Sequence, residues 1–258
     1  MTEPVGIAEA VRRLVQARRS GQPVPAVPLP DAPSAYAVQD GVARALGWFG
    51  AGDRAPHFWK SGGPSRDIEL THAPLPPAGV WRSPVVAPAG WPSWRLRGIE
   101  AEVALRLGRD VDAALAATLD TPRAAALVDA MCVSIEIVDS RWAEALDAPP
   151  LARLADLQSH GALVLGDWAR FEPARDWAAQ TCRVRIGTAP EAVYQGSHPL
   201  ADPCFVLPQW LRHATRHGAT VAAGSVVSAG SWCGLLHADA GDTVHVAFDG
   251  IGDARVTL

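Results

Sequence analysis

The chain has 258 residues, of which 48% are hydrophobic, and its 23 basic and 27 acidic side chains give a net charge of -4. This length fits one large domain, or one domain with a small extension. No run of basic residues stands out, and no apolar stretch approaches the length of a transmembrane helix. We therefore expect neither a nucleic-acid partner nor a membrane partner.

The four cysteines are widely spaced and form no C-x-x-C pair, which argues against a zinc knuckle and against a disulfide scaffold. The first 20 residues carry several charges and lack the apolar core of a secretory signal peptide. These observations predict a cytoplasmic protein with buried free thiols.

The first 80 residues predict helices and extended segments. Apolar side chains recur at helical spacing in two stretches, and prolines fill the stretch between them. In chain order we expect a helix over residues 5–20, a proline-rich connector over 21–33, a helix over 34–46 capped by Ser34, a strand over 57–60 broken at Ser61, and a region of prolines and turns over 71–93. We assign residues 1–80 to this N-terminal helical and extended segment.

The remaining residues, 81–258, predict a β-rich core. Alternating apolar runs separated by glycine and aspartate turns indicate strands. We expect a strand over 98–105, mostly helix over 110–131 with Thr121 as a cap, a strand over 132–141, a helical turn over 151–156, strands over 161–166, 181–186, 221–228, 243–248 and 253–258, and a helix over 207–217. The fold class is therefore α+β, with a mainly β core and flanking helices that could be continuous with the first segment.

Two carboxylates lie two residues apart in the apolar run over residues 98–105. Because strand side chains alternate between faces, Glu100 and Glu102 project from the same face. Two like charges on a half-buried strand repel each other and are costly to desolvate. A hard divalent cation such as Mg2+, which takes oxygen ligands, would relieve both effects. The alternative is a solvated strand face without a ligand.

A third carboxylate, Glu136, interrupts the strand over residues 132–141, which is rich in isoleucine and valine. A lone charge in such a strand needs a partner. Asp139 lies three residues further along and faces the opposite way in a regular strand, where Arg141 could pair with it. Glu136 could therefore join a metal site or form a buried ion pair with an arginine.

Several motifs, in order, resemble the fumarylacetoacetate hydrolase superfamily, and most of all its 2-keto-4-pentenoate hydratase branch. The most specific are I-E-A-E-V-A over residues 99–104 and I-E-I-V-D-S-R over 135–141. They are accompanied by Y-A-V-Q over 36–39, K-S-G over 60–62, A-D over 155–156, S-H-G-A-L-V-L-G over 159–166, H-P-L over 198–200, W-L over 210–211, A-G-S-V-V-S-A-G-S-W over 223–232 and A-G-D over 240–242. The resemblance implies a mixed-roll β core, homo-oligomers and a role in degrading aromatic compounds.

The resemblance also implies a divalent cation, Mg2+ or Mn2+, held by Glu100, Glu102 and Glu136. A small 2-oxo acid would chelate that cation through its carboxylate and its C2 oxygen. Lys60 matches a lysine of the family, and we expect it to act as an acid/base or to hold the substrate's carboxylate. Desolvation by its aromatic neighbours would lower its pKa toward neutrality.

Four further residues are candidates for substrate binding by the same resemblance: Ser231, Asp156, Gln158 and His72. Ser231 could equally belong to a tight strand end, and Asp156 could cap a turn. His72 lies where hydratases usually carry an Asp-Tyr-Gly or Asp-Phe-Gly segment, which is absent here. Leu157 stands where family members often have asparagine.

The expected reaction is the addition of water to a 2-hydroxydienoate or 2-oxo-enoate such as 2-keto-4-pentenoate. One alternative is decarboxylation of a 2-oxo-3-enedioate of the 4-oxalocrotonate type, whose extra carboxylate needs a cation such as Arg66 or Arg141. A second is hydrolysis of a C–C bond in an acylpyruvate, although the early helix lacks the H-x-x-E pattern of that branch. A third is a non-catalytic family member.

Overall fold

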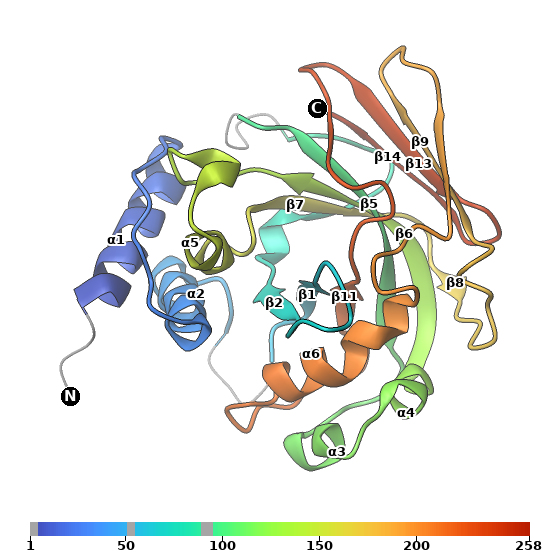
Figure 1. The fold of residues 1–258 in the computed structure, drawn as a ribbon, viewed down its shortest axis with the longest axis horizontal. Coiled ribbons are helices and arrows are strands. Elements are labelled where there is room, and N and C mark those ends of the chain that lie inside the picture. The colour runs from blue at the N-terminus through green and yellow to red at the C-terminus, as the bar shows by residue number, and fades with distance from the viewer. Residues whose placement is uncertain (1–4, 51–54, 89–94) are drawn as a thin grey trace.

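Two β-sheets pack against each other and helices flank the larger one (Figure 1). The computed structural model describes residues 5–50, 55–88 and 95–258. The larger sheet has the strand order β2 (Thr71–Pro74), β1 (Phe58–Gly62), β11 (Val226–Ser228), β5 (Gly98–Leu107), β6 (Val128–Val138), β7 (His160–Leu165), β3 (Val80–Arg82), with β12 (Leu236–His237) paired to β5 and β8 (Ala169–Arg170) paired to β6. The second sheet has the order β10 (Ala192–Gln195), β9 (Thr181–Ile186), β13 (Thr243–Phe248), β14 (Gly252–Thr257), β4 (Val85–Val86).

The helices form two groups on the larger sheet. Helices α1 (Val5–Ser20), α2 (Ala32–Leu46) and α5 (Pro150–Ala155) share an apolar cluster of their own. Helices α3 (Ala113–Ala117) and α4 (Thr121–Ala125) both contact α6 (Leu207–Ala214) on another side of the molecule. Short 3-10 turns occur at Pro77–Gly79, Ala145–Asp147 and Pro203–Val206. No helix in the described part of the chain is long and apolar enough to cross a membrane.

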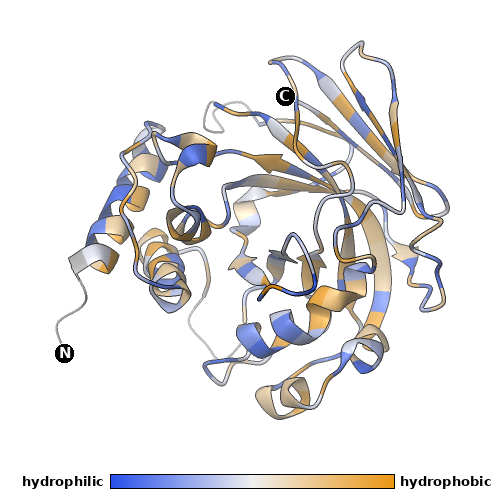
Figure 2. Ribbon diagram, in the orientation of Figure 1, coloured by the Kyte–Doolittle hydropathy of each residue, from blue (hydrophilic) through white to orange (hydrophobic). Residues whose placement is uncertain are grey.

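The main core lies between the two sheets. Ile99, Ala101 and Val103 of β5 are fully buried in it, as the alternation of the sequence predicts. Strand β6 is buried along nearly its whole length, whereas the outer sheet alternates between hydrophobic and hydrophilic residues (Figure 2). The predicted α+β class with a mainly β core is therefore confirmed.

The predicted boundary between residues 80 and 81 does not separate two sheets. Strands β1 and β2, which precede it, pair inside the larger sheet, and β1 lies directly beside β11 from the end of the chain. The N-terminal helices have a separate apolar cluster, but the strands that follow them belong to the core. The sequence reading left this continuity open.

Several element ends differ from the expectation. Asp31, not Ser34, caps α2, because its extended backbone lets its carboxylate accept the Ser34 N–H. Asp120, not Thr121, caps α4 in the same way. Helix α4 ends at Ala125 and β6 begins at Val128, since β5 recruits these residues into a ladder. Further along, β11 is shorter than expected. Residues 89–93 of the predicted turn region lie outside the described residues.

Candidate active site

Cross-strand register places the acidic residues on one face of the larger sheet. Directly paired residues of neighbouring strands share a face. Glu100 of β5 lies opposite Glu136 of β6, and Glu102 lies opposite Ser134. One oxygen of each of the three glutamates lies within 4.8 Å of the others. The spacing within β5 was predictable from the sequence, whereas the pairing that adds Glu136 required the fold.

Glu136 is fully buried and shares one oxygen between two nitrogen groups. Its Oε1 lies 2.5 Å from Lys60 Nζ, which donates to it, and 3.0 Å from His160 Nδ1. Its Oε2 is buried and accepts no hydrogen bond from the described residues. A buried carboxylate oxygen without a partner costs free energy that a cation at this point would recover.

Glu102 is held by the loop that follows β11. Its Oε2 accepts hydrogen bonds from Ser228 Oγ at 2.5 Å and from the Gly230 N–H at 3.2 Å. Ser228 Oγ also lies 2.8 Å from Ser134 Oγ. Gly230 has φ +102, a region that favours glycine, so its backbone can turn its N–H toward the carboxylate. These contacts leave Oε1 of Glu102 available to a ligand.

The three carboxylates titrate differently because their partners differ. Burial, aided by the nearby Glu136, raises the pKa of Glu100 to about 8 and that of Glu102 to about 7. Burial also acts to raise the pKa of Glu136, but Lys60 and His160 outweigh it and hold that pKa below its usual value. Glu100 and Glu102 therefore retain protons near neutral pH, because full ionisation would bury three negative charges beside one ammonium group.

Lys60 is the only lysine in the sequence, which otherwise uses arginine for its strong bases. Its ammonium is buried, and it also lies 3.4 Å from the Gln158 carbonyl. Burial acts to lower its pKa, but Glu136, Glu100 and Glu102 raise the pKa above the usual value. The expected lowering by aromatic neighbours is therefore wrong for the metal-free site. Trp59 is packed in the main core, whereas Lys60 faces the carboxylates.

The donor set fits a hard divalent cation. Three carboxylates converge, one of their oxygens is an orphaned buried acceptor, and two carboxyl groups are destabilised as anions by burial. Oxygen-only ligands suit Mg2+, Mn2+ or Ca2+ better than softer ions. These residues can thus hold a divalent metal.

A cavity of about 900 Å3 opens over the cluster. Lys60, Glu100 and Glu102 line it together with side chains from the β1–β2 loop, α5 and the loop after β11. Two of the predicted substrate-binding residues, Gln158 and Ser231, also line it. Ser231 Oγ donates to the Gly234 carbonyl at 2.7 Å, and Gln158 Nε2 donates to Thr71 Oγ1. Gln158 Oε1 is buried without a partner among the described residues.

The other two predicted substrate-binding residues do not line this cavity. His72, on β2, is buried and packs on His213, and its Nδ1 lies 2.8 Å from Ser61 Oγ. Burial lowers its pKa to about 3, so it is neutral near pH 7. Asp156 is completely buried in ion pairs with Arg141 at 2.7 Å and Arg18 at 3.1 Å.

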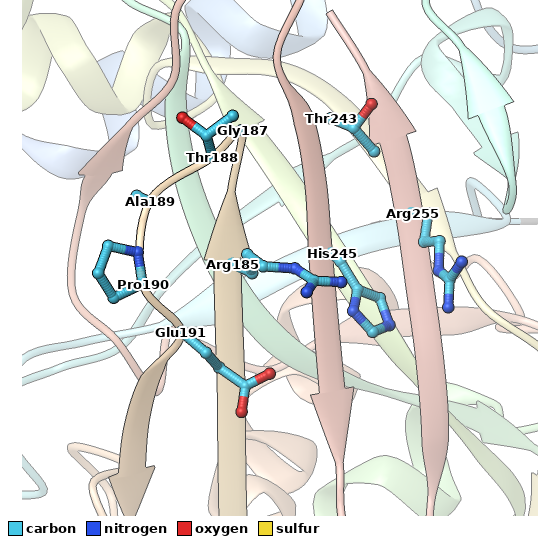
Figure 3. Close-up of a pocket in the computed structure, with 9 residues that line it drawn as sticks. All are labelled: Arg185, Gly187, Thr188, Ala189, Pro190, Glu191, Thr243, His245 and Arg255. Atoms are coloured by element: carbon cyan, nitrogen blue, oxygen red, sulfur yellow. The ribbon is translucent and has the colours of Figure 1, made fainter.

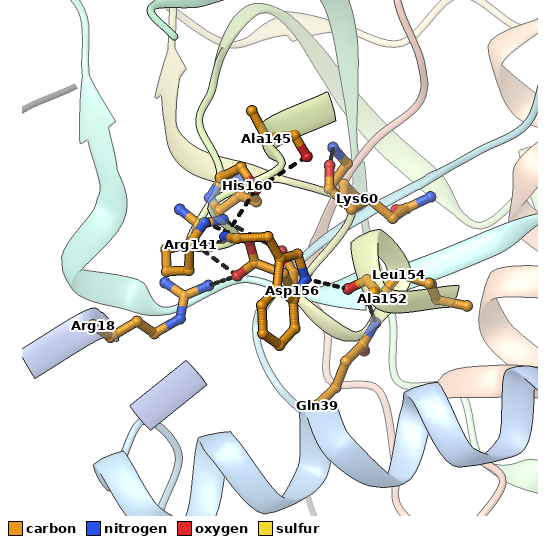
Figure 4. A network of polar contacts seen from close by, with 12 residues as sticks. Arg18, Gln39, Lys60, Arg141, Ala145, Ala152, Leu154, Asp156 and His160 are labelled. Atoms are coloured by element: carbon orange, nitrogen blue, oxygen red, sulfur yellow. Dashed lines mark hydrogen bonds and ion pairs between the residues drawn. The ribbon is translucent and has the colours of Figure 1, made fainter. Parts of the chain in front are cut away.

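Figure 4 shows how the Asp156 network extends from α1 toward the site. The sequence suggested that Arg141 could pair with Asp139, and this expectation is wrong, because Arg141 pairs with Asp156. Asp139 instead accepts the backbone N–H groups of Arg95 and Leu96. Sequence spacing does not identify this partner, since Asp156 is 15 residues from Arg141 and is brought there by the fold.

The turn between α5 and β7 has an unusual backbone. Leu157, Gln158 and Ser159 all have positive φ, between +54 and +59. Left-handed backbone costs about 1–2 kcal/mol for a residue with a side chain, and asparagine tolerates it better than leucine. The turn aims the Gln158 carbonyl at Lys60. It therefore helps to fix the lysine beside Glu136.

Four site residues were not singled out from the sequence: Ser228, Gly230, His160 and Arg153. The first three occur within the quoted motifs, and their roles follow only from cross-strand neighbours. Arg153 lies on α5 and lines the cavity. Its spacing from the acidic motifs gives no signal, because helix and sheet meet only in the folded chain.

A second cavity, of about 450 Å3, lies on the outer sheet (Figure 3). It is lined by basic side chains, namely Arg185, His245 and Arg255. Glu191 supplies the one carboxylate among its described lining residues. This cavity cannot hold a hard cation as the glutamate cluster can.

The mixed sheet, the three convergent carboxylates and the buried lysine together have the arrangement of a divalent-metal site. Residues 52–258 match the model of the fumarylacetoacetate (FAA) hydrolase C-terminal family. This match covers most of the chain, and the protein belongs to that family. No curated protein matches the sequence.

Solved structures share the fold at low sequence identity. The chain is similar to 4-oxalocrotonate decarboxylase from Pseudomonas putida G7 complexed with magnesium and adipate, with a TM-score of 0.81, 17% identity and coverage of 97% of this chain and 96% of that chain. A 5-carboxymethyl-2-hydroxymuconate delta-isomerase from Mycobacterium smegmatis gives a TM-score of 0.51 at 16% identity, covering 78% and 75% of the two chains. The likeness to the first includes the N-terminal helices as well as the sheets.

Proposed function

We propose that the protein is a divalent-metal-dependent lyase that adds water to a 2-hydroxydienoate or 2-oxo-enoate such as 2-keto-4-pentenoate, in the degradation of aromatic compounds. The observation that carries the proposal is the clustering of three glutamates with Lys60, of which Lys60, Glu100 and Glu102 line one cavity. Membership of the family, in which residues 52–258 match, supports enzyme activity.

In this proposal Glu100, Glu102 and Glu136 hold Mg2+ or Mn2+. The bound cation supplies Lewis-acid polarisation of the substrate's C2 oxygen. Ser228 and the Gly230 N–H keep Glu102 oriented, and His160 keeps Glu136 oriented. Such outer contacts fix the ligands that touch a metal. The bound magnesium of the P. putida enzyme is consistent with this choice of ion.

Lys60 holds a proton at Nζ within the site. The glutamates that keep it protonated would lose much of their field on binding a dication, so its pKa would fall toward the working range of a general acid. Gln158 and Ser231 line the cavity, and in this proposal they contact the substrate. Asp156 and His72 do not contact the substrate in this proposal, since neither lines the cavity. They stabilise the elements that carry the site.

A second candidate is decarboxylation of a 2-oxo-3-enedioate. The nearly full-length likeness to a 4-oxalocrotonate decarboxylase favours it, and adipate in that structure is itself a dicarboxylate. In this reaction the bond between C5 and the distal carboxylate breaks, and its electron pair moves through the alkene to the C2 oxygen. Carbon dioxide leaves, and one proton is taken up to give a 2-hydroxydienoate.

The test is turnover by the purified protein with Mg2+ or Mn2+. Loss of the ultraviolet absorbance of 2-hydroxypentadienoate would support hydration, whereas carbon dioxide release from a 2-oxo-3-enedioate would move the assignment to decarboxylation. Removal of the metal with a chelator should abolish either activity. Absence of turnover with these acids and with acylpyruvates would contradict the enzymatic proposal and leave a binding protein.

Lys60→Met is the matched variant for this test. It should lower kcat by about 10²–10⁴-fold, the usual contribution of a positioned acid or base, while metal binding persists. Arg66→Met is a suitable control, because Arg66 Nε donates to the Leu200 carbonyl and the side chain does not line the cavity. Unchanged turnover in Lys60→Met would dismiss the catalytic role of the lysine.

We also propose that the protein works as a cytoplasmic homo-oligomer, as the family resemblance implies. Light scattering coupled to gel filtration measures the mass of the particle in solution. A mass of one chain, 27.2 kDa, at micromolar concentration would contradict the oligomer.

A further inference from the structure

Arg153 brings an unpaired positive charge to the cavity. It lies in the last turn of α5, is half-buried, and lines the same cavity as the glutamate cluster. Its Nε is buried and has no hydrogen-bond partner in the described part of the chain. No carboxylate among the described residues lies within ion-pair distance of its guanidinium. A buried donor without a partner is costly, so this position calls for a ligand.

Three other part-buried arginines form ion pairs. Arg141 and Arg18 bind Asp156, and Arg175 binds Glu172. Arg66, which the sequence offered as a candidate cation, donates to a backbone carbonyl instead. Four arginines in the described part of the chain have a buried Nε without a partner, namely Arg18, Arg97, Arg153 and Arg175, and of these only Arg153 lines the cavity over the glutamates.

The charges around the cavity are divided between different elements. Glu100 and Glu102 reach it from β5, where a cation would bind, and Lys60 is committed to Glu136. Arg153 reaches it from α5, beside the apolar side chains of Pro150 and Leu154. A ligand that has one end at the cation can thus present its other end to the arginine.

We propose that Arg153 binds a second carboxylate at the far end of the substrate, so that the protein selects 2-oxo dicarboxylic acids over 2-oxo monocarboxylic acids. Guanidinium groups bind carboxylates through two parallel hydrogen bonds and remain charged throughout the accessible pH range. The inference rests on the second candidate of the proposed function, decarboxylation of a 2-oxo-3-enedioate, because 2-keto-4-pentenoate has no second carboxylate. It takes the 2-oxo end of the substrate to be held at the metal.

Glu69 offers a different partner for the arginine. It lies at the exposed rim of the cavity, on the loop between β1 and β2, and forms no ion pair with the described residues. If this loop moved inward, Glu69 and Arg153 could pair and the arginine would be structural. Glu69→Gln is therefore included in the test.

The experiment compares two saturated six-carbon ligands that differ only at C6. 2-Oxoadipate ends in a carboxylate and 2-oxohexanoate ends in a methyl group. Calorimetric titration of the full-length protein, with and without Mg2+, gives their affinities. We expect the wild-type protein with Mg2+ to bind 2-oxoadipate about 10–100-fold more tightly, the range of a charged hydrogen bond.

Arg153→Met should remove most of this preference while leaving the affinity for 2-oxohexanoate unchanged. Arg153→Lys should retain part of it, because a lysine keeps the charge but loses the paired geometry. Glu69→Gln should keep the full preference. Thermal melting of each variant establishes that it is folded.

The outcomes separate the two proposals. Equal, Mg2+-dependent binding of both acids by the wild-type protein would overturn the role of Arg153 and leave the proposed metal site intact. A preference that persists in Arg153→Met, or disappears in Glu69→Gln, would also overturn it. Failure of both acids to bind in the presence of Mg2+ would overturn the proposed function itself, and the inference with it.

Discussion

At the scale of single residues, Glu136 decides the character of the site. It shares Oε1 between Lys60 and His160, and its Oε2 has no described partner. Its neighbours in sequence predict a buried strand, and that prediction holds. The identity of its partner was not predictable, because Lys60 is 76 positions away and lies on a strand that only the folded sheet brings near.

Because Lys60 is the sole lysine, its titration can be followed as one signal. In the metal-free protein the three glutamates hold its pKa above the usual value. Bound Mg2+ offsets their charge, so the pKa should fall on metal addition. Carbon-13 NMR of protein labelled at lysine Cε, titrated with and without Mg2+, measures both values. An unchanged or higher pKa with saturating Mg2+ would show that the metal does not bind at these glutamates.

The raised pKa values of Glu100 and Glu102 make metal binding depend on pH. Metal displaces protons from groups with pKa values of about 8 and about 7, so affinity should rise between pH 6 and pH 8.5, by about 100–1,000-fold. The same groups have folded-state pKa values above the unfolded ones. Their contribution to the stability of the metal-free protein is therefore complete below about pH 4.5 and is lost as the pH rises through about 8.

Calorimetric titration with Mg2+ at several pH values measures the first effect, and urea unfolding of the metal-free protein measures the second. Glu102→Gln serves as the control, because it removes one of the two titrating groups and should flatten both dependences. An Mg2+ affinity that does not change with pH would be inconsistent with the proposed ligands.

At the scale of elements, the sequence predicted the strands better than their pairing. The period-two pattern placed Glu100 and Glu102 on one face of β5, and alternation placed Ile99 and Ala101 in the core. Periodicity within a strand does not identify the strands that lie beside it. That Lys60 and Glu136 lie near Glu100 and Glu102 was therefore expected from the resemblance and not from periodicity. Helix ends were mispredicted where an aspartate one or more residues earlier provided the better cap.

The backbone conformation of Gly230, in the loop after β11, orients an N–H group toward Glu102. Gly230→Ala would force a residue with a side chain to φ +102, while its N–H supports Glu102. We expect a loss of about 1–2 kcal/mol in unfolding free energy and about 10-fold weaker Mg2+ binding as Glu102 shifts. Urea unfolding and calorimetry measure the two effects.

Gly218→Ala is the matched control for this substitution. Gly218 also has positive φ, at +78, but a Cβ there meets no heavy atom within 4 Å. It should lose a similar unfolding free energy and keep the wild-type affinity for Mg2+. If Gly230→Ala also kept the wild-type affinity, the Gly230 N–H would have no role in holding Glu102.

At the scale of the whole molecule, one buried network joins the N-terminal helices to the catalytic sheet. Arg18 of α1 and Arg141, which follows β6, both bind Asp156 at the end of α5 (Figure 4). The turn that begins at Asp156 carries the Gln158 carbonyl beside Lys60. The helices therefore reach the active site through a chain of contacts, although their apolar cluster is separate from the main core.

Arg18→Met tests whether this network contributes to stability and to the site. Removal of the Arg18 guanidinium leaves Asp156 with Arg141 alone, which destabilises the folded protein. It also removes the cost of burying a charged guanidinium, the cost that lowers the pKa of Arg18 to about 9. The two effects oppose each other, so we expect a net loss of about 1–2 kcal/mol, less than for breaking an isolated buried ion pair. Arg19→Met on the same helix, which removes an exposed side chain bonded to a backbone carbonyl, should change stability by about 0.5 kcal/mol or less.

Urea unfolding monitored by tryptophan fluorescence gives the free energies of both variants, and turnover gives their effect on the site. If the network only anchors α1, Arg18→Met should keep the wild-type kcat. A lower kcat at an unchanged affinity for Mg2+ would instead show that the network positions the turn beside Lys60. Equal stability of the Arg18 and Arg19 variants would contradict both the anchoring and the positioning interpretation. The ion pair between Arg18 and Asp156 would then contribute no more to stability than an exposed arginine.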